Sequence, residues 1–433
     1  MPETSHIKII ADPARQVDDM LGRLRQATGS APIFHLVLGG TELSDLPGLS
    51  AAGATPADRR KTPALDADAL RRSLSHKEKV RLPASPAGIT SPVVLTKACL
   101  DLFETKLEIV DAGTFIAPEE NHKTVGVRPA HRAGSGQALS MEEVEHLFQE
   151  GLQAGAENNH KYPVSLLAEC VPGGTTTAAL VLSLLLEENA DLAALCSSSL
   201  VPNLKTEALE ENLAQTGNAP TTGFDKTAFL ESELKALAES RGASLKDLKQ
   251  ECRLNPLKAV AMAGDPMQAY AAAYLLTKSQ SALAIAAGGS QMLAVYRLAS
   301  LLAGEEKRLA GFWCGNFDAD TFQKNCLVAT TSYVAFDRAA RIPELADLCQ
   351  APLVSVDPGL KNSCHSGLRA YEQGHVKEGV GAGAACLLAC TLGKLEQQQL
   401  LTLIDNTYSC LVQPEQTEPT ETKPDSQAPN ATV

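Results

Sequence analysis

A turn rich in glycine and threonine near the middle of the chain has the composition of a phosphate-binding loop. An apolar run ends at Glu169, and Gly173, Gly174, Thr175 and Thr176 follow before a helical apolar pattern begins. Glycines let the backbone approach a ligand closely, and free N–H groups at a helix start can bind phosphate together with threonine hydroxyls. No Gly-Lys-Ser/Thr follows, so the turn is not a Walker A loop. A tight turn with threonine caps is the alternative explanation.

Two further turns separate an apolar segment from a helical pattern. One contains Gly288, Gly289 and Ser290, of which the serine is a natural helix N-cap. The other contains Gly264 and Asp265 followed by a proline, which is the usual form of a helix start. Helix capping alone can explain both turns. Because several such turns occur in one chain, we also consider the five residues candidate substrate contacts at a shared anion site.

Glu378 is the candidate for proton transfer. It stands in a turn that also contains Gly379, Gly381 and Gly383, directly before an apolar helical pattern. A carboxylate beside a dry pocket can act as a general base. The alternative is an acidic partner for the positive end of the following helix.

The histidine and cysteine pattern predicts no metal site. His365 follows Cys364, but a Cys–His hydrolase needs spatial adjacency and an orienting residue, and neither is visible in the sequence. The 11 cysteines include no CxxC pair and no zinc ligand set. We interpret the cysteines within apolar runs as small buried hydrophobic residues. These are Cys99, Cys170, Cys386 and Cys390.

The candidate residues must be positioned by strands and helices, and the sequence predicts that these two kinds of element alternate along the chain. Continuous apolar runs predict strands buried on both faces, as in a parallel sheet. The predicted strands are Ile33–Leu38, Leu107–Val110, Val164–Ala168, Leu283–Ala287, Leu327–Val334 and Leu353–Val356. Helical patterns lie between them, and the clearest begins at Ser140 with Glu143 three residues later, a capping box. The alternation predicts a doubly wound, mostly parallel α/β sheet, in which ligands bind beyond the carboxyl ends of the strands.

Composition excludes several classes of partner. The net charge of -13 argues against nucleic acid and against anionic membranes, since both need a basic surface. The N-terminal residues carry charges throughout and do not resemble a secretory signal. No run approaches the roughly 20 apolar residues of a membrane span. An odd number of cysteines suits a reducing compartment, so we expect a cytoplasmic protein.

Several motifs together resemble a known enzyme family. They occur in order between about residues 39 and 383 as GGTELSDLPGLSAAGAT, TPALDADAL, VVLTKACLDL, VDAG, ECVPGGTTTA, GDPMQ, AGGSQMLAV, GLRAYEQG and VKEGVGAG. The chain is similar to the nicotinate-nucleotide–dimethylbenzimidazole phosphoribosyltransferases, in the branch of archaea and cyanobacteria. The phosphate turn departs from the pattern, because Ala168 replaces a glycine and because Pro172 and a third threonine change the turn.

The resemblance implies a Rossmann-like core and a smaller helical region built from both chain ends, usually in a homodimer. It divides the chain into an N-terminal helical segment (residues 1–30), a core (31–357), a C-terminal helical segment with the catalytic turn (358–411) and a disordered tail (412–433). Residues 218–254 match nothing in the pattern and are interpreted as an insertion. The charge of the tail and its high content of Pro, Thr, Glu and Gln also favour disorder.

The resemblance also implies a reaction and assigns residues to it. Ribose 5-phosphate would move from nicotinate mononucleotide to a flat benzimidazole-type base, with no cofactor and no metal. Glu378 would be the catalytic base, Glu169 and residues 173–176 would lie near the ribose phosphate, and Lys205 is the candidate phosphate-binding lysine. Apolar residues around Met267 and Met292 could form the slot for the base.

Two alternatives stay open. One is a nucleotide or phosphate sensor without catalytic activity on the same fold, which the added Pro172 favours and the presence of Glu378 disfavours, because a sensor needs no base. The other is a related ribosyl transferase with a different acceptor base. The sequence leaves the acceptor base open, because benzimidazoles, adenine and phenolic compounds are all flat.

Overall fold

The computed structural model describes residues 6–27, 29–72, 82–85, 87–119, 121–157, 161–187, 226–303, 317–337, 340–375 and 378–412. Lys205, the first section of the predicted insertion and all of the predicted tail except Val412 lie outside these ranges. None of the helices formed by the described residues is both long and apolar enough to cross a membrane.

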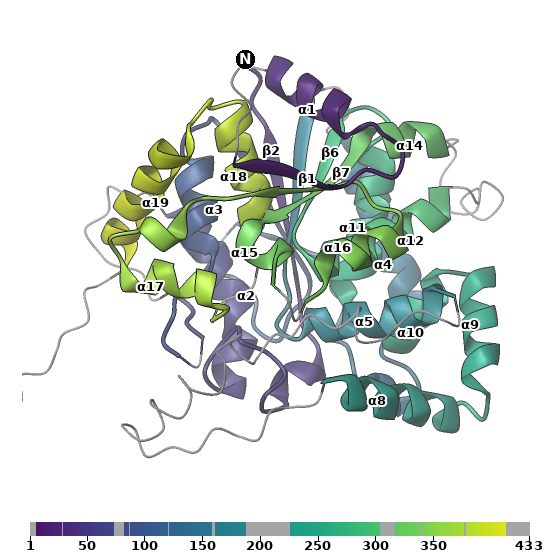
Figure 1. The fold of residues 1–433 in the computed structure, drawn as a ribbon. Coiled ribbons are helices and arrows are strands. Elements are labelled where there is room, and N and C mark those ends of the chain that lie inside the picture. The colour runs from purple at the N-terminus through teal and green to yellow at the C-terminus, as the bar shows by residue number, and fades with distance from the viewer. Residues whose placement is uncertain are drawn as a thin grey trace, which may run out of the picture.

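The centre of the molecule is an eight-stranded sheet in the order β1-β8-β7-β6-β5-β2-β3-β4 (Figure 1). Its strands are β1 Ile7–Ala11, β2 Ile33–Gly39, β3 Lys106–Gly113, β4 Lys123–Thr124, β5 Val164–Cys170, β6 Leu283–Ala287, β7 Cys326–Thr331 and β8 Leu353–Val356. All neighbouring pairs are parallel except β1 with β8. The chain builds outward from β2 to β3 and β4 on one side and from β5 to β8 on the other. The strand order therefore reverses between β2 and β5, and ligands bind at such a point in open α/β sheets.

Helices cover both faces of the sheet (Figure 1). One layer contains α2 Pro56–Arg71, α3 Val93–Leu100, α18 Ala382–Thr391 and α19 Gln397–Leu411. The other contains α4 Met141–Glu157, α5 Gly174–Leu185, α10 Leu257–Ala263, α11 Pro266–Lys278 and α12 Ser290–Ala303. Strands β2, β5, β6, β7 and β8 are buried along their whole length because both faces are covered.

The remaining helices and turns complete the fold. The helices are α1 Val17–Gln26, α8 Lys226–Ser240, α9 Leu245–Leu254, α14 Ala319–Asn325, α15 Ser332–Ala335, α16 Ile342–Cys349 and α17 Ser366–Arg369. The 3-10 turns are η1 Glu42–Asp45, η2 Ala133–Ser135, η3 Leu360–Asn362 and η4 Ala370–Gln373. The described section of the predicted insertion forms α8 and α9, which pack against each other and against α5.

The structure confirms the predicted α/β fold and all six predicted strands, with differences at their ends. The strand predicted to reach Val334 ends at Thr331, and the last apolar residues form α15 instead. Helix α4 begins as predicted, with Ser140 Oγ accepting from Glu143 N at 3.1 Å. Strands β1 and β4 were not predicted. Strand β1 lies in the N-terminal stretch for which the resemblance implied helix, and it joins the sheet edge antiparallel to β8.

Candidate active site

A pocket opens where the strand order of the sheet reverses, at the carboxyl end of β5. The space within it, including the part open to solvent, is about 670 Å³. Its walls are formed by residues 50–52, 83–85, 89–92, 169–175 and 378–380, together with Thr62, Asp66 and Gln291. The polar groups in these walls include three carboxylic acids, Asp66, Glu169 and Glu378. Segments from both helical layers therefore meet at one acidic site.

Glu378 is held in the pocket by three hydrogen bonds. Its Oε1 accepts from the backbone N–H of Gly383 at 2.7 Å, and its Oε2 accepts from the N–H of Thr331 at 3.1 Å and from the hydroxyl of Thr330. The side chain is half-buried, which keeps it within reach of a ligand. Burial raises the pKa of Glu378 to about 7, although the three hydrogen bonds oppose the rise. A carboxyl that titrates near neutral pH is suited to accept a proton.

The turn that follows Glu378 has a strained backbone. Val380 adopts φ 53°, which a β-branched residue rarely does. Its N–H donates to the carbonyl oxygen of Glu169 at 2.9 Å, and its carbonyl oxygen accepts from the hydroxyl of Thr96 at 2.8 Å. These two bonds fix the turn to β5 and to α3. Strain of this kind persists where surrounding contacts impose it, commonly at functional sites.

Close packing explains a glycine of the same turn. A Cβ atom on Gly383 would lie 2.3 Å from the carbonyl carbon of Thr330 and 2.6 Å from Glu378 Oε1. Only glycine therefore lets α18 begin against the end of β7 while its backbone donates to the carboxylate. This contact was not derivable from the spacing of the glycines.

Glu169 lies at the end of β5 and is almost completely buried. Its Oε2 accepts from the N–H of Val171, and its Oε1 accepts from Nε2 of Gln291, both at 3.0 Å. Burial raises the pKa of Glu169 to about 8, and the nearby carboxyls Asp265, Glu378 and Asp66 add to the rise. The sequence pattern did not single out Gln291, although it directly follows the predicted contact Ser290.

Asp66 is a second pocket residue that the sequence pattern did not single out. It lies on α2, is 1% exposed, and its Oδ2 accepts from the thiol of Cys170 at 3.4 Å. Its Oδ1 has no hydrogen-bond partner among the described residues. Burial raises the pKa of Asp66 to about 7, against the opposing effect of Ser91 and Cys170. The segment TPALDADAL contributed to the family resemblance, but nothing in it distinguished this aspartate.

The glycine- and threonine-rich turn forms another wall. Gly173, with φ 87°, caps α5, and Gly173, Gly174 and Thr175 line the pocket. Thr176 is fully buried beneath the turn and does not line the pocket. The ammonium group of Lys226, at the start of α8, donates to the hydroxyl of Thr175 at 3.1 Å. A lysine thus lies at this turn, in the segment that was predicted to be an insertion.

The other predicted contacts lie away from the pocket walls. Asp265 is the N-cap of α11, where its Oδ1 accepts from Met267 N at 3.1 Å and its Oδ2 accepts from the hydroxyl of Thr177. Helix capping thus accounts for its position. Gly264 is the C-cap of α10, and Gly288, Gly289 and Ser290 lie at the start of α12. All four are buried and lie outside the pocket walls. Met267 and Met292 are both completely buried in the core, so the prediction that they form a slot for a base is not supported by their positions.

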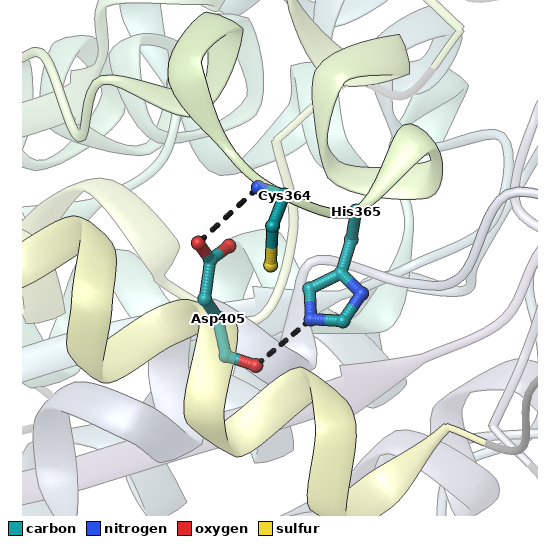
Figure 2. A group of neighbouring side chains, drawn as sticks. All are labelled: Cys364, His365 and Asp405. Atoms are coloured by element: carbon teal, nitrogen blue, oxygen red, sulfur yellow. Dashed lines mark hydrogen bonds between the residues drawn. The ribbon is translucent and has the colours of Figure 1, made fainter.

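A separate surface group could hold a metal ion. Cys364, His365 and Asp405 bring one potential ligand atom each to within 4.8 Å of one another (Figure 2). The sequence shows no such ligand set because Asp405 lies on α19, 40 residues after His365. The carboxylate accepts from Ser363 Oγ at 2.5 Å and from Cys364 N at 3.3 Å. These bonds fasten the loop to α19 and explain the grouping without a metal.

The four cysteines that were interpreted as small hydrophobic residues are all buried, which confirms that prediction. Cys99 lies on α3 and Cys386 on α18, with their sulfur atoms 3.8 Å apart. Thiols of this size let the two helices approach each other. Both cysteines belong to the core and do not line the pocket.

The fold and the pocket define an α/β protein with an acidic pocket at its topological switch point. Comparison with known proteins then gives the family. A UPF0284 protein of Nostoc sp. (strain PCC 7120) is 34% identical over 404 residues, covering 90% of this chain and 96% of its own length. A UPF0284 protein of Synechocystis sp. (strain PCC 6803) is 34% identical over 395 residues, covering 90% and 94%. The chain belongs to this UPF0284 family.

A solved structure shares the fold. It is the nicotinate-nucleotide-dimethylbenzimidazole phosphoribosyltransferase from Thermus thermophilus, with a TM-score of 0.50 and 14% sequence identity. The alignment covers 90% of this chain and 92% of that chain. No protein-family model matches the sequence.

Proposed function

We propose that the protein is a phosphoribosyltransferase that transfers ribose 5-phosphate from nicotinate mononucleotide to a benzimidazole-type base, a step toward the lower ligand of cobamides. The observation that carries the proposal is Glu378, a half-buried carboxylate at the pocket with a pKa of about 7. The solved structure that shares the fold is named for this reaction. The sequence motifs around Glu378 and Glu169 support the same activity.

In the proposed reaction, the bond between the ribose C1′ and the nicotinate nitrogen breaks, and its electron pair returns to that nitrogen. A ring nitrogen of the incoming base forms the new bond to C1′ from the opposite face, so the configuration inverts. Positive charge develops on the ribose in such glycosyl transfers. The proton of the incoming base passes to Glu378, whose Oε1 and Oε2 are already oriented by Gly383 and Thr331.

Two physical effects account for rate acceleration. Transfer of a proton to a positioned base contributes typically about 10²- to 10⁴-fold. Holding donor and acceptor in one pocket contributes further, because the reaction becomes effectively unimolecular. Neither effect requires a cofactor or a metal, and nicotinate mononucleotide acts as a substrate.

The phosphate of the nucleotide is proposed to bind at the turn of Gly173, Gly174 and Thr175. The turn lies at the start of α5, and helix starts attract anions. Lys226 is the proposed cation of this phosphate site, because its ammonium group donates to Thr175. Lys205, the candidate that the resemblance suggested, lies outside the described residues.

The assembly and location of the protein are also proposals. The family resemblance favours a homodimer, and the cysteine content of the sequence favours the cytoplasm. Light scattering of the purified protein would test the dimer. An assay of nicotinate release with both substrates tests the activity itself. A sensor without catalytic activity would bind the nucleotide and release no nicotinate.

A further inference from the structure

Three buried oxygen atoms in the pocket walls lack hydrogen-bond partners among the described residues. One is Oε1 of Gln291, and the other two are Oδ1 of Asp66 and Oγ1 of Thr90. Asp66 is 1% exposed and Thr90 is 9% exposed, and both residues line the pocket. Ser91, which follows Thr90, lowers the pKa of Asp66 through a side-chain hydrogen bond, so Asp66 lies beside the loop that carries Thr90.

The unsatisfied oxygen of Asp66 is unusual for a folded protein. Most buried polar side-chain atoms have a partner, and an exception in a native structure points to a function or to an unfilled ligand position. The neighbouring atom Oδ2 is engaged by Cys170, but a thiol is a weak donor. Burial opposes ionisation of Asp66 and raises its pKa to about 7, while side-chain hydrogen bonds from Ser91 and Cys170 oppose the rise.

The chemistry of the two side chains defines what they would bind. An ionised carboxylate only accepts hydrogen bonds, whereas a threonine hydroxyl both accepts and donates. The backbone carbonyl of Thr90 is already engaged, because it accepts from the hydroxyl of Tyr371 at 2.6 Å. That bond fixes the loop before α3, so the side chain of Thr90 is held at the wall of the pocket.

We propose that Asp66 and Thr90 form a substrate-binding subsite that accepts hydrogen bonds from N–H or O–H groups of the ligand. This inference rests on the proposed function, since the pocket is the same. Two portions of the proposed substrates carry such donors. The ribose of nicotinate mononucleotide presents hydroxyl groups, and the acceptor base presents a ring N–H.

The experiment measures binding of each substrate separately by isothermal titration calorimetry. The full-length wild type, Asp66→Leu and Asp66→Asn are titrated with nicotinate mononucleotide and, in a second series, with 5,6-dimethylbenzimidazole. Leucine removes both acceptors at a similar volume, and asparagine keeps one. Asp68→Asn is the matched control, because Asp68 lies on the same helix but outside the pocket walls.

Loss of a hydrogen bond to a charged group predicts a rise in Kd of roughly 10- to 100-fold for Asp66→Leu with one of the two probes. A smaller rise is expected for Asp66→Asn and none for the control. Weaker nucleotide binding identifies the ribose hydroxyls as the donors. Weaker binding of the base would place its single N–H at Asp66 and would contradict the assignment of that proton to Glu378. The melting temperature of Asp66→Leu should not fall, because the change removes an unsatisfied buried oxygen.

Unchanged affinity for both probes in Asp66→Leu would overturn the subsite, as would a lower melting temperature with unchanged affinity. The second result would make Asp66 a structural residue. A wild type that binds neither probe would overturn it too. Wild-type protein that binds the probes but releases no nicotinate would refute the proposed transfer, while the affinities of the variants still decide the subsite.

Discussion

Glu378 combines two properties that oppose each other in most carboxylates. Burial raises its pKa to about 7, whereas two backbone N–H groups and the Thr330 hydroxyl stabilise its ionised form. The result is a carboxyl that is firmly oriented yet able to gain a proton near neutral pH. Those are the requirements for a general base in a pocket.

Replacing Glu378 by glutamine tests this role. Glutamine keeps the size of the side chain and loses the ability to accept a proton. We expect the turnover number for nicotinate release to fall by about 10²- to 10⁴-fold, with the Kd for nicotinate mononucleotide nearly unchanged. Glu142→Gln, on the exposed face of α4, is the control and should behave as wild type.

The pH profile gives an independent check of the same residue. Because Glu378 must be ionised to act as a base, kcat/KM should fall as the pH drops below about 7 and level off above it. Full activity in Glu378→Gln, or a rate that does not change between pH 6 and pH 8, would exclude Glu378 as the base.

Glu378 was a candidate because it stands in a glycine-rich turn before an apolar helical pattern, and Glu169 was a candidate through the family resemblance. Asp66 was not predicted as a site residue, because it occurs inside a helical pattern next to Asp68, where aspartates ordinarily face solvent. Its burial depends on the packing of α2 against β2 and β5. Such long-range packing has no local pattern in the sequence.

At the scale of elements, the turn between Glu378 and α18 determines the position of the carboxylate. Val380 is held at φ 53° by bonds to β5 and to α3, and Gly383 packs against Thr330 of β7. Three elements far apart in the sequence therefore position one side chain. The turn should be sensitive to small changes of volume.

Gly383→Ala is the corresponding change. The new methyl group would lie 2.3 Å from the Thr330 carbonyl carbon and 2.6 Å from Glu378 Oε1, so both must move. We expect a loss of about 1–3 kcal/mol in the free energy of unfolding and a large drop in turnover. Chemical denaturation and the nicotinate assay measure the two effects. Gly22→Ala in α1, where nothing lies within 4 Å, should not destabilise the protein, and an equally stable, active Gly383→Ala would contradict the packing argument.

Helix α8 supplies the proposed phosphate-binding lysine. In Lys226→Met the ammonium group is lost while most of the side chain is kept. We expect a roughly 10- to 100-fold rise in the Kd for nicotinate mononucleotide and no change for nicotinate, which has no phosphate. Calorimetric titrations measure both. Lys235→Met on the exposed face of α8 is the control, and equal nucleotide affinity in both variants would remove Lys226 from the phosphate site.

The elements themselves were largely predictable from the sequence. Strands buried on both faces appear as continuous apolar runs, which is why β2, β5 and β6 could be located. Strands β1 and β4 were not predicted, because β1 is partly exposed and β4 has two residues. Lys226 was missed because the contact between α8 and α5 depends on tertiary structure.

At the scale of the whole molecule, three carboxylic acids, Asp66, Glu169 and Glu378, come together in the pocket at the strand reversal between β2 and β5. The pKa values of Asp66 and Glu378 rise to about 7, and that of Glu169 to about 8. In the unfolded chain these groups ionise near pH ~4. The folded protein therefore binds more protons than the unfolded chain from roughly pH 4 up to about pH 8.

This difference predicts how stability depends on pH. Where the folded state binds more protons, the free energy of unfolding falls as the pH rises. Burial lowers the pKa of His35 from 6.5, which has the opposite effect below that pH. We therefore expect the ligand-free protein to lose stability from pH 6.5 to pH 8, with a smaller loss in Glu169→Gln. Chemical denaturation at several pH values measures this, and a stability that rises over the same range would contradict the raised pKa values.

The most direct test of the proposed function is a chromatographic assay of the purified protein with nicotinate mononucleotide and 5,6-dimethylbenzimidazole. We predict release of nicotinate together with a new ribosylated product, and neither compound when the base is omitted. Intact nucleotide binding with no product from any of a panel of flat bases would contradict the transferase and favour a nucleotide sensor on the same fold.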